Sequence, residues 1–308
     1  MKCIDFYKKI VKFLDKKAKA QGVTDLEKYY ETTDKYAGWY GTFKIEDINL
    51  CFVQLAFHAQ NATIISNIVK FNKNFDFLSR VFCGFKIKDF LKKYFPSKDK
   101  KDFEGSIDKI VKTLCFDEKT NPDGLHWVDT KNKSNKKDCI ISRYAKALIN
   151  GALYLDNFNT RKELIDDLKK QNTIYKRGNI IDKNRNMINY FIGKVGEGSG
   201  FSVALACDFI KELDTCFDFL AKPDIHIMDV MEALLNKPER YYRQSTAKAF
   251  ECLSTFQKLV DDINKQLPSN QKITVYQLDR MIWLICSDNF FLDYQNLDKD
   301  DFIKEIRN

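Results

Sequence analysis

The sequence has few of the residues that hold metal ions. Only 3 histidines occur in 308 residues, and none lies in an H-E-x-x-H motif or beside a cysteine pair. A zinc site would therefore need ligands from distant parts of the chain. The 9 cysteines form no C-x-x-C pair, which is typical of reduced, buried thiols and not of a disulfide framework or an iron–sulfur cluster. We expect no bound metal and a cytoplasmic location.

Turn-forming residues and long apolar runs are also scarce. The 12 glycines and 5 prolines leave little material for the many tight turns of an all-β fold. No long segment alternates between apolar and polar residues, so we expect few or no strands. The N-terminal segment MKCIDFYKKIVKFLDKKAKAQG carries a charge every few positions, which predicts neither a signal peptide nor a membrane span.

Aromatic and basic residues are abundant. The 25 phenylalanines and 14 tyrosines, within a chain that is 44% hydrophobic, argue for a folded protein and against disorder. The chain is long enough for one large or two small cores. The 51 Lys and Arg residues exceed the 43 Asp and Glu residues, giving a net charge of +8. This charge is compatible with a polyanionic partner and equally with an ordinary lysine-rich surface.

Apolar residues recur at helical spacing along most of the chain. The pattern predicts amphipathic or apolar helices over residues 3–20, 142–154, 244–267 and 274–290. Residues 49–75 read as two further helical stretches joined near positions 58–62. Two lysine-rich segments, 92–105 and 129–138, contain few apolar residues and are predicted to be exposed loops. The predicted class is therefore all-α.

A glycine-rich turn lies between two apolar helical stretches in residues 182–213. The segment reads DKNRNMINYFIGKVGEGSGFSVALACDFIKEL. Glycines permit positive φ and close backbone approach, so the backbone N–H groups of this turn can converge on a phosphate. The same turn would also allow two helices to cross closely. No strand precedes the glycines and no G-K-[ST] follows them, which argues against a Rossmann or P-loop nucleotide site.

Asp224 follows Pro223 and precedes an apolar run, so the sequence predicts a helix N-cap at this position. The glycine hairpin followed by the segment PDIHI resembles the helix-hairpin-helix (HhH-GPD) DNA glycosylase superfamily, in which a catalytic aspartate follows the hairpin in a D-x-H-like context. The upstream segment FHAQNAT is similar to the L-S-A-Q-x-T segment of that family. The resemblance covers residues 45–290 and is strongest over 193–235.

The resemblance implies an all-α, two-lobed helical fold with a helix-hairpin-helix motif. Its cleft would lie between an N-plus-C-terminal lobe and a hairpin-bearing lobe. Three regions are expected along the chain. They are an N-terminal helical extension at 1–44, a glycosylase-like region at 45–290 with the hairpin at about 182–213 and the catalytic aspartate loop at about 214–235, and a C-terminal tail at 291–308.

The resemblance also assigns roles to individual residues. Asp224 would be the catalytic carboxylate, which stabilises positive charge on the deoxyribose and activates water. Gln60, with Asn61 beside it, would fill the gap that the flipped base leaves. The remaining residues expected to contact DNA are Lys194, Gly196, Gly198, Gly200 and Lys222. The partner would be double-stranded DNA, bound by a monomer in the cytoplasm at the nucleoid.

The resemblance favours a monofunctional hydrolase. Bifunctional members carry a lysine two residues after the second hairpin glycine, where this sequence has Gly200. No four-cysteine cluster follows Asp224, so no iron–sulfur cofactor is expected, and only a structural monovalent cation at the hairpin is compatible. Two alternatives stay open. They are a noncatalytic helix-hairpin-helix DNA-binding protein, and a bifunctional glycosylase and AP lyase that uses another lysine. The excised base, and a role in base excision repair or in defence against foreign DNA, are left open by the sequence.

Overall fold

The computed structural model describes residues 2–20, 47–61, 74–115, 119, 140–173, 175–177, 180–182, 184–196, 199–286 and 299–307. The chain forms two units. Unit 1 contains Met1–Lys44, Ile174–Arg185 and Ile210–Asn308, and unit 2 contains Ile45–Thr173 and Asn186–Phe209. Two of the unit boundaries fall at the start of one hairpin helix and near the end of the other.

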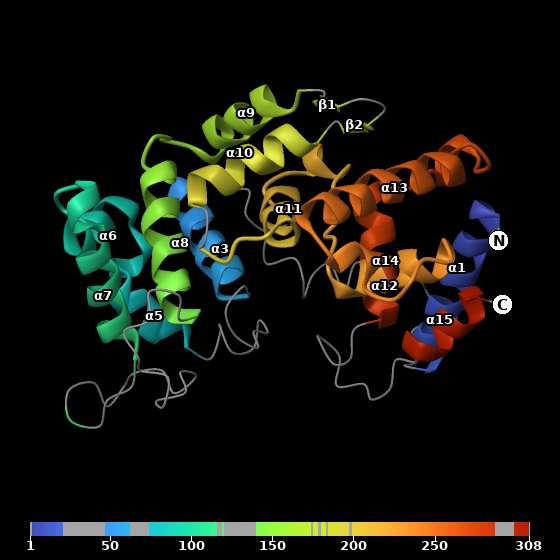
Figure 1. Ribbon diagram of the computed structural model, residues 1–308, viewed down its shortest axis with the longest axis horizontal. Helices are drawn as coiled ribbons and strands as arrows, with labels where there is room; N and C mark the ends of the chain where they lie inside the picture. The colour runs from blue at the N-terminus through green and yellow to red at the C-terminus, as the bar shows by residue number, and fades with distance from the viewer. Residues whose placement is uncertain are drawn as a thin grey trace. The chain divides into compact units, whose positions relative to one another are not determined.

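Unit 2 is built from helices that cover the central pair α3 and α8 (Figure 1). Gly151 of α8 allows the close approach, since a Cβ atom there would lie 2.6 Å from Leu55 of α3. The helices are α3 (Ile48–Asn61), α5 (Phe75–Val81), α6 (Ile87–Tyr94), α7 (Phe103–Leu114), α8 (Ile140–Leu155), α9 (Arg161–Gln171), most of α10 (Arg185–Val195) and the first part of α11 (Val203–Lys211), with short 3-10 turns η1 (Cys83–Phe85) and η2 (Lys100–Asp102).

Aromatic side chains fill the core between α3, α6 and α8. Phe52, Phe82 and Phe90 are fully buried. The ring of Phe52 meets that of Phe90 edge-on with centroids 5.0 Å apart, and Phe82 packs in the same way against Tyr144 at 6.2 Å. Such edge-to-face pairs add stability beyond the burial of their area. This core therefore accounts for part of the high phenylalanine content of the sequence.

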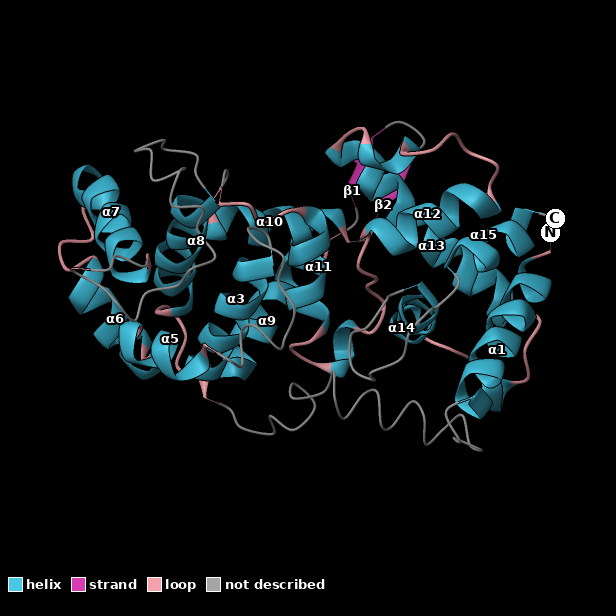
Figure 2. Ribbon diagram, turned by 90° about the horizontal axis from the view of Figure 1, so that it is seen from below, coloured by secondary structure: helices cyan, strands magenta, loops and turns pink. Residues whose placement is uncertain are grey.

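Unit 1 joins the first helix of the chain to its last helices. Its elements are α1 (Cys3–Ala20), the antiparallel strands β1 (Tyr175–Arg177) and β2 (Ile180–Asp182), η4 (Thr215–Phe217), α12 (Ile225–Leu234), η5 (Tyr241–Arg243), α13 (Thr246–Asn264), η6 (Ser269–Gln271), α14 (Val275–Cys286) and α15 (Lys299–Arg307). The apolar face of α1 packs against α13 and α14, and α15 packs against α12. Figure 2 shows that helix predominates, with a single small strand pair in the described residues.

The predicted all-α class is confirmed for the described residues, where helices predominate. One local prediction is tested only in part, and another was wrong. Helix α3 continues through positions 58–61 of the expected joint, whereas position 62 and the second stretch lie outside the described residues. Segment 92–105 is not a continuous loop, since its two ends belong to α6 and α7. Segment 129–138 lies outside the described residues. No described helix combines the length and apolar character that a membrane crossing requires.

Candidate functional site

Asp224 caps the N-terminus of α12, as the sequence predicts. One carboxylate oxygen, Oδ1, accepts hydrogen bonds from the backbone N–H groups of His226 at 2.8 Å and Ile227 at 3.2 Å. Pro223 disfavours helical backbone at the residue before it, Lys222. The second oxygen, Oδ2, accepts no hydrogen bond from any residue that the structure describes. The side chain is therefore fixed through one oxygen and keeps the other for a further partner.

A buried ion pair anchors the backbone that leads into Asp224. The ammonium group of Lys211 lies 2.7 Å from Asp279 Oδ2, and their side chains are 8% and 4% exposed. The same oxygen accepts the backbone N–H of Lys222 at 3.1 Å. Burial raises the pKa of Asp279, and the Lys211 ammonium opposes this shift. All four residues belong to unit 1, so this pair sets the position of the loop within that unit.

His226 follows Asp224 by two residues and points its Nδ1 atom into the protein. That atom is buried and has no hydrogen-bond partner among the described residues. Burial lowers the pKa of His226, and the charges of Lys299 and Lys222 lower it further. Asp224 and Asp229 oppose the shift. The folded protein therefore resists protonation of this imidazole.

This arrangement predicts a loss of stability at acidic pH. A histidine whose pKa is lower in the folded state binds its proton mainly in the unfolded state. The free energy of unfolding should therefore fall as pH drops below 6.5, the ordinary value, and continue to fall down to the lowered pKa. In His226→Gln this part of the pH dependence should disappear. Urea unfolding of both proteins between about pH 8 and pH 5 measures it, and identical slopes would contradict the prediction.

Two glycines of the hairpin have the positive φ that the sequence suggests. Helix α10 ends at Val195, and Gly196 and Gly200 have φ angles of 93° and 82°. The backbone N–H of Ser199 donates to the carbonyl of Gly196 at 3.2 Å. Gly198 lies outside the described residues. The positive φ angles favour glycine at both positions.

Lys194 precedes the hairpin and is exposed at the end of α10. Its ammonium group lies 5.0 Å from the centre of the Tyr190 ring. The structure thus places Lys194, Gly196 and Gly200 together in unit 2, and Lys222 with Asp224 in unit 1.

Gly196→Ala is expected to lower the free energy of unfolding by about 2 kcal/mol. Besides the positive φ, an added Cβ atom would lie 2.1 Å from the side-chain nitrogen of Asn150 on α8. Gly193→Ala is the matched control, since this glycine lies inside α10 with open space around it, where alanine favours the helix by up to about 1 kcal/mol. Urea denaturation compares the two. Equal effects would mean that Gly196 has no special backbone role.

Gln60 and Asn61 form the end of α3. The Gln60 side chain is only 1% exposed, so it lies inside unit 2 and not at its described surface. A side chain that fills a gap in DNA must reach the duplex, so the wedge role would require the last turn of α3 to open. That role stays a prediction. For Asn61 the structure describes only the backbone.

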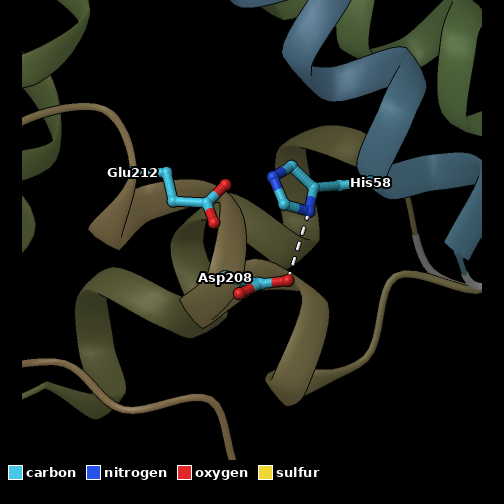
Figure 3. A group of neighbouring side chains, drawn as sticks. All are labelled: His58, Asp208 and Glu212. Atoms are coloured by element: carbon cyan, nitrogen blue, oxygen red, sulfur yellow. Dashed lines mark ion pairs between the residues drawn. The ribbon is translucent and has the colours of Figure 1, made fainter. Parts of the chain in front are cut away.

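Sequence reasoning missed a buried pair between the two halves of unit 2. His58 of α3 is fully buried, and its Nδ1 lies 3.4 Å from Oδ2 of Asp208 on α11 (Figure 3). Glu212, also drawn there, follows Asp208 by four residues and belongs to unit 1. Within unit 2 the pair offers two ligand atoms, one fewer than the three protein ligands of a typical catalytic zinc site. The sequence feature that could have identified Asp208 is its charge within an otherwise apolar helical run.

No protein-family model, curated protein or solved structure matches this chain. The likeness to the HhH-GPD superfamily therefore depends on the residues themselves, in particular on the hairpin at 193–200 and the segment around Asp224. The structure adds the positive φ angles of two hairpin glycines and the N-cap geometry of Asp224. These two features are the basis for assigning a function.

Proposed function

We propose that this protein is a DNA glycosylase that removes a damaged or modified base by hydrolysing its N-glycosidic bond. The observation that carries the proposal is the geometry of Asp224. Two backbone N–H groups orient the carboxylate through Oδ1, and Oδ2 accepts no hydrogen bond from the described residues. An oriented carboxylate with one available oxygen is what a sugar carrying positive charge, or an attacking water, requires.

The chemistry follows from the charge that develops during bond cleavage. As the bond between C1′ and the base nitrogen breaks, its electron pair leaves with the base and positive charge builds on the deoxyribose. The Asp224 carboxylate stabilises that charge. Water then forms the new bond to C1′ and passes its proton to Asp224, and the departing base takes up a proton. Asp224 returns to its ionised form when it releases its proton to solvent.

The hairpin supplies the binding step of the proposal. Backbone N–H groups around Gly196 and Gly200 would hold a phosphate of the DNA strand, with Lys194 adding a positive charge nearby. Such contacts hold the strand without reading its sequence, while the target base is flipped out of the duplex. With a net charge of +8, binding to double-stranded DNA should weaken steeply as salt increases. The proposed enzyme works as a monomer without an organic cofactor.

One observation favours the noncatalytic alternative. The bonds from His226 and Ile227 form a full N-cap, and an N-cap alone explains an aspartate at this position with about 1 kcal/mol of stability. In that case the protein would bind duplex DNA through the hairpin and leave the glycosidic bond intact. The bifunctional variant differs in another way, because a lysine would form a Schiff base with the sugar that borohydride traps.

The proposal is tested by incubating the wild-type protein with duplexes that each contain one altered base. Oxidised purines, alkylated purines, mismatched bases and hypermodified bases form the panel, and mass spectrometry detects the free base. Release from one duplex supports the proposal and names the substrate. Salt-sensitive duplex binding without any release would favour the noncatalytic alternative. Absence of duplex binding would overturn both.

A further inference from the structure

A basic hollow in unit 2 contains none of the proposed catalytic or DNA-binding residues. Its lining includes Lys88 and Lys92 of α6, Lys98 beyond the end of that helix, and Asp156 just after α8, over an apolar floor to which Phe95 contributes. The hollow has a volume of about 370 Å³. Sites for small molecules commonly enclose about 300–1,000 Å³, so this space is large enough for a compact ligand.

Two of the lysines are available to such a ligand. Lys88 and Lys92 are four residues apart, so they share one face of α6. Both are exposed, and neither forms an ion pair or hydrogen bond with any part of the chain that the structure describes. By contrast, the adjacent Lys93 donates to the carbonyl of Val81 at 3.1 Å. Like charges at this spacing weaken a helix, and a bound anion would relieve their repulsion.

The charge balance of the hollow indicates which anion fits. Asp156 accepts a hydrogen bond from Lys98 at 2.8 Å, so this ammonium group is already neutralised. Lys88 and Lys92 leave two positive charges beside the same space. A phosphate monoester carries nearly two negative charges at neutral pH, because its second pKa is about 6. A phosphodiester carries one, so the balance favours a terminal phosphate over the internal phosphates of a nucleic acid.

We propose that this hollow binds a small phosphate monoester, such as a sugar phosphate or a nucleoside monophosphate. The ammonium groups of Lys88 and Lys92 hold the phosphate as compact point charges. The apolar part of the lining, where Pro96 is exposed above the buried Phe95, receives the organic part of the ligand, since a phosphate alone fills only a fraction of the space. The site lies wholly within unit 2 and does not depend on the proposed glycosylase activity.

Isothermal titration calorimetry of the full chain tests the proposal with ribose 5-phosphate, adenosine 5′-monophosphate and inorganic phosphate, with adenosine as the probe that lacks phosphate. Lys88→Gln combined with Lys92→Gln should weaken binding of the phosphates about tenfold or more. Lys100→Gln combined with Lys112→Gln removes the same charge from exposed positions outside the hollow and should change little. Asp156→Asn should tighten binding, because it frees another ammonium group.

The affinity should also decrease as pH falls through about 6, where the phosphate loses its second charge. Circular dichroism spectra of the variants should match that of the wild type, since the substituted lysines are exposed. The proposal is overturned if no phosphate binds saturably, or if both double variants weaken binding equally. It is also overturned if only a 5′-phosphorylated oligonucleotide binds through these lysines, since the ligand would then be a nucleic-acid end.

Discussion

Asp224→Asn should lower the rate of base release about 10³-fold and leave folding and duplex binding nearly unchanged. Asparagine is as good an N-cap as aspartate, so its side-chain oxygen can keep the bonds from His226 and Ile227 that orient the native carboxylate. It cannot carry the negative charge that stabilises the sugar or accept a proton from water. The substitution therefore separates the structural role from the chemical one. Single-turnover kinetics on the duplex identified in the panel measure the loss.

Asp214→Asn is the matched control for this experiment. Asp214 caps the short turn η4 in the same unit, where its Oδ1 accepts the backbone N–H of Cys216 at 2.8 Å. The same chemical change at this cap should leave base release unaltered. If Asp224→Asn released base at the wild-type rate, Asp224 would be a cap only. A parallel loss in both variants would point to a general structural defect.

Asp279→Ala should lower the free energy of unfolding by about 3–5 kcal/mol. The substitution removes the carboxylate that pairs with the Lys211 ammonium group, whose side chain is only 8% exposed and which also lies 5.2 Å from the centre of the Tyr276 ring. It also removes the acceptor of the Lys222 backbone N–H, which costs further stability as long as that group stays buried. Since Lys222 lies two residues before Asp224, the loop that carries the proposed catalytic residue loses its anchor at the same time.

A double variant shows whether the cost comes from a buried charge that has lost its carboxylate. Lys211→Met combined with Asp279→Leu removes both charges and keeps the volume, so it should recover most of the lost stability. Asp262→Ala is the surface control, since its pair with Lys265 is 2.8 Å long and mostly exposed. Such pairs contribute little, and its urea midpoint should stay close to that of the wild type. A double variant as unstable as Asp279→Ala would contradict this explanation.

Local patterns in the sequence predicted part of this structure. Pro223 followed by Asp224 and an apolar run gave the N-cap correctly, because capping depends on adjacent residues. The glycines of the hairpin predicted positive φ for the same reason. The joint expected at positions 58–62 does not begin at position 58, because α3 continues to Asn61. The polar side chains of His58 and Gln60 are buried, and the polarity of a residue does not show whether it is buried.

Patterns in the sequence could not predict ion pairs between residues that lie far apart in the chain. Lys211 and Asp279 are 68 residues apart, and each is of a residue type that most often lies at the surface. Only the packing of α14 within unit 1 brings the carboxylate to that lysine. The hollow on α6 was missed for a similar reason. Segment 92–105 has the composition of a solvated basic loop, and the sequence does not show that Asp156 lies beside Lys98.

The pairing of α1 with the C-terminal helices has a consequence for how the chain is made. Phe13 meets Phe302 with ring centroids 5.0 Å apart, and Lys9 bonds to Glu305, 296 positions later. During vectorial synthesis on the ribosome, α1 emerges long before its partners α13, α14 and α15. Its amphipathic face must remain uncovered while the intervening chain, including all of unit 2, is translated. Contacts of such high sequence separation slow folding, and an apolar face that stays uncovered favours aggregation of the nascent chain.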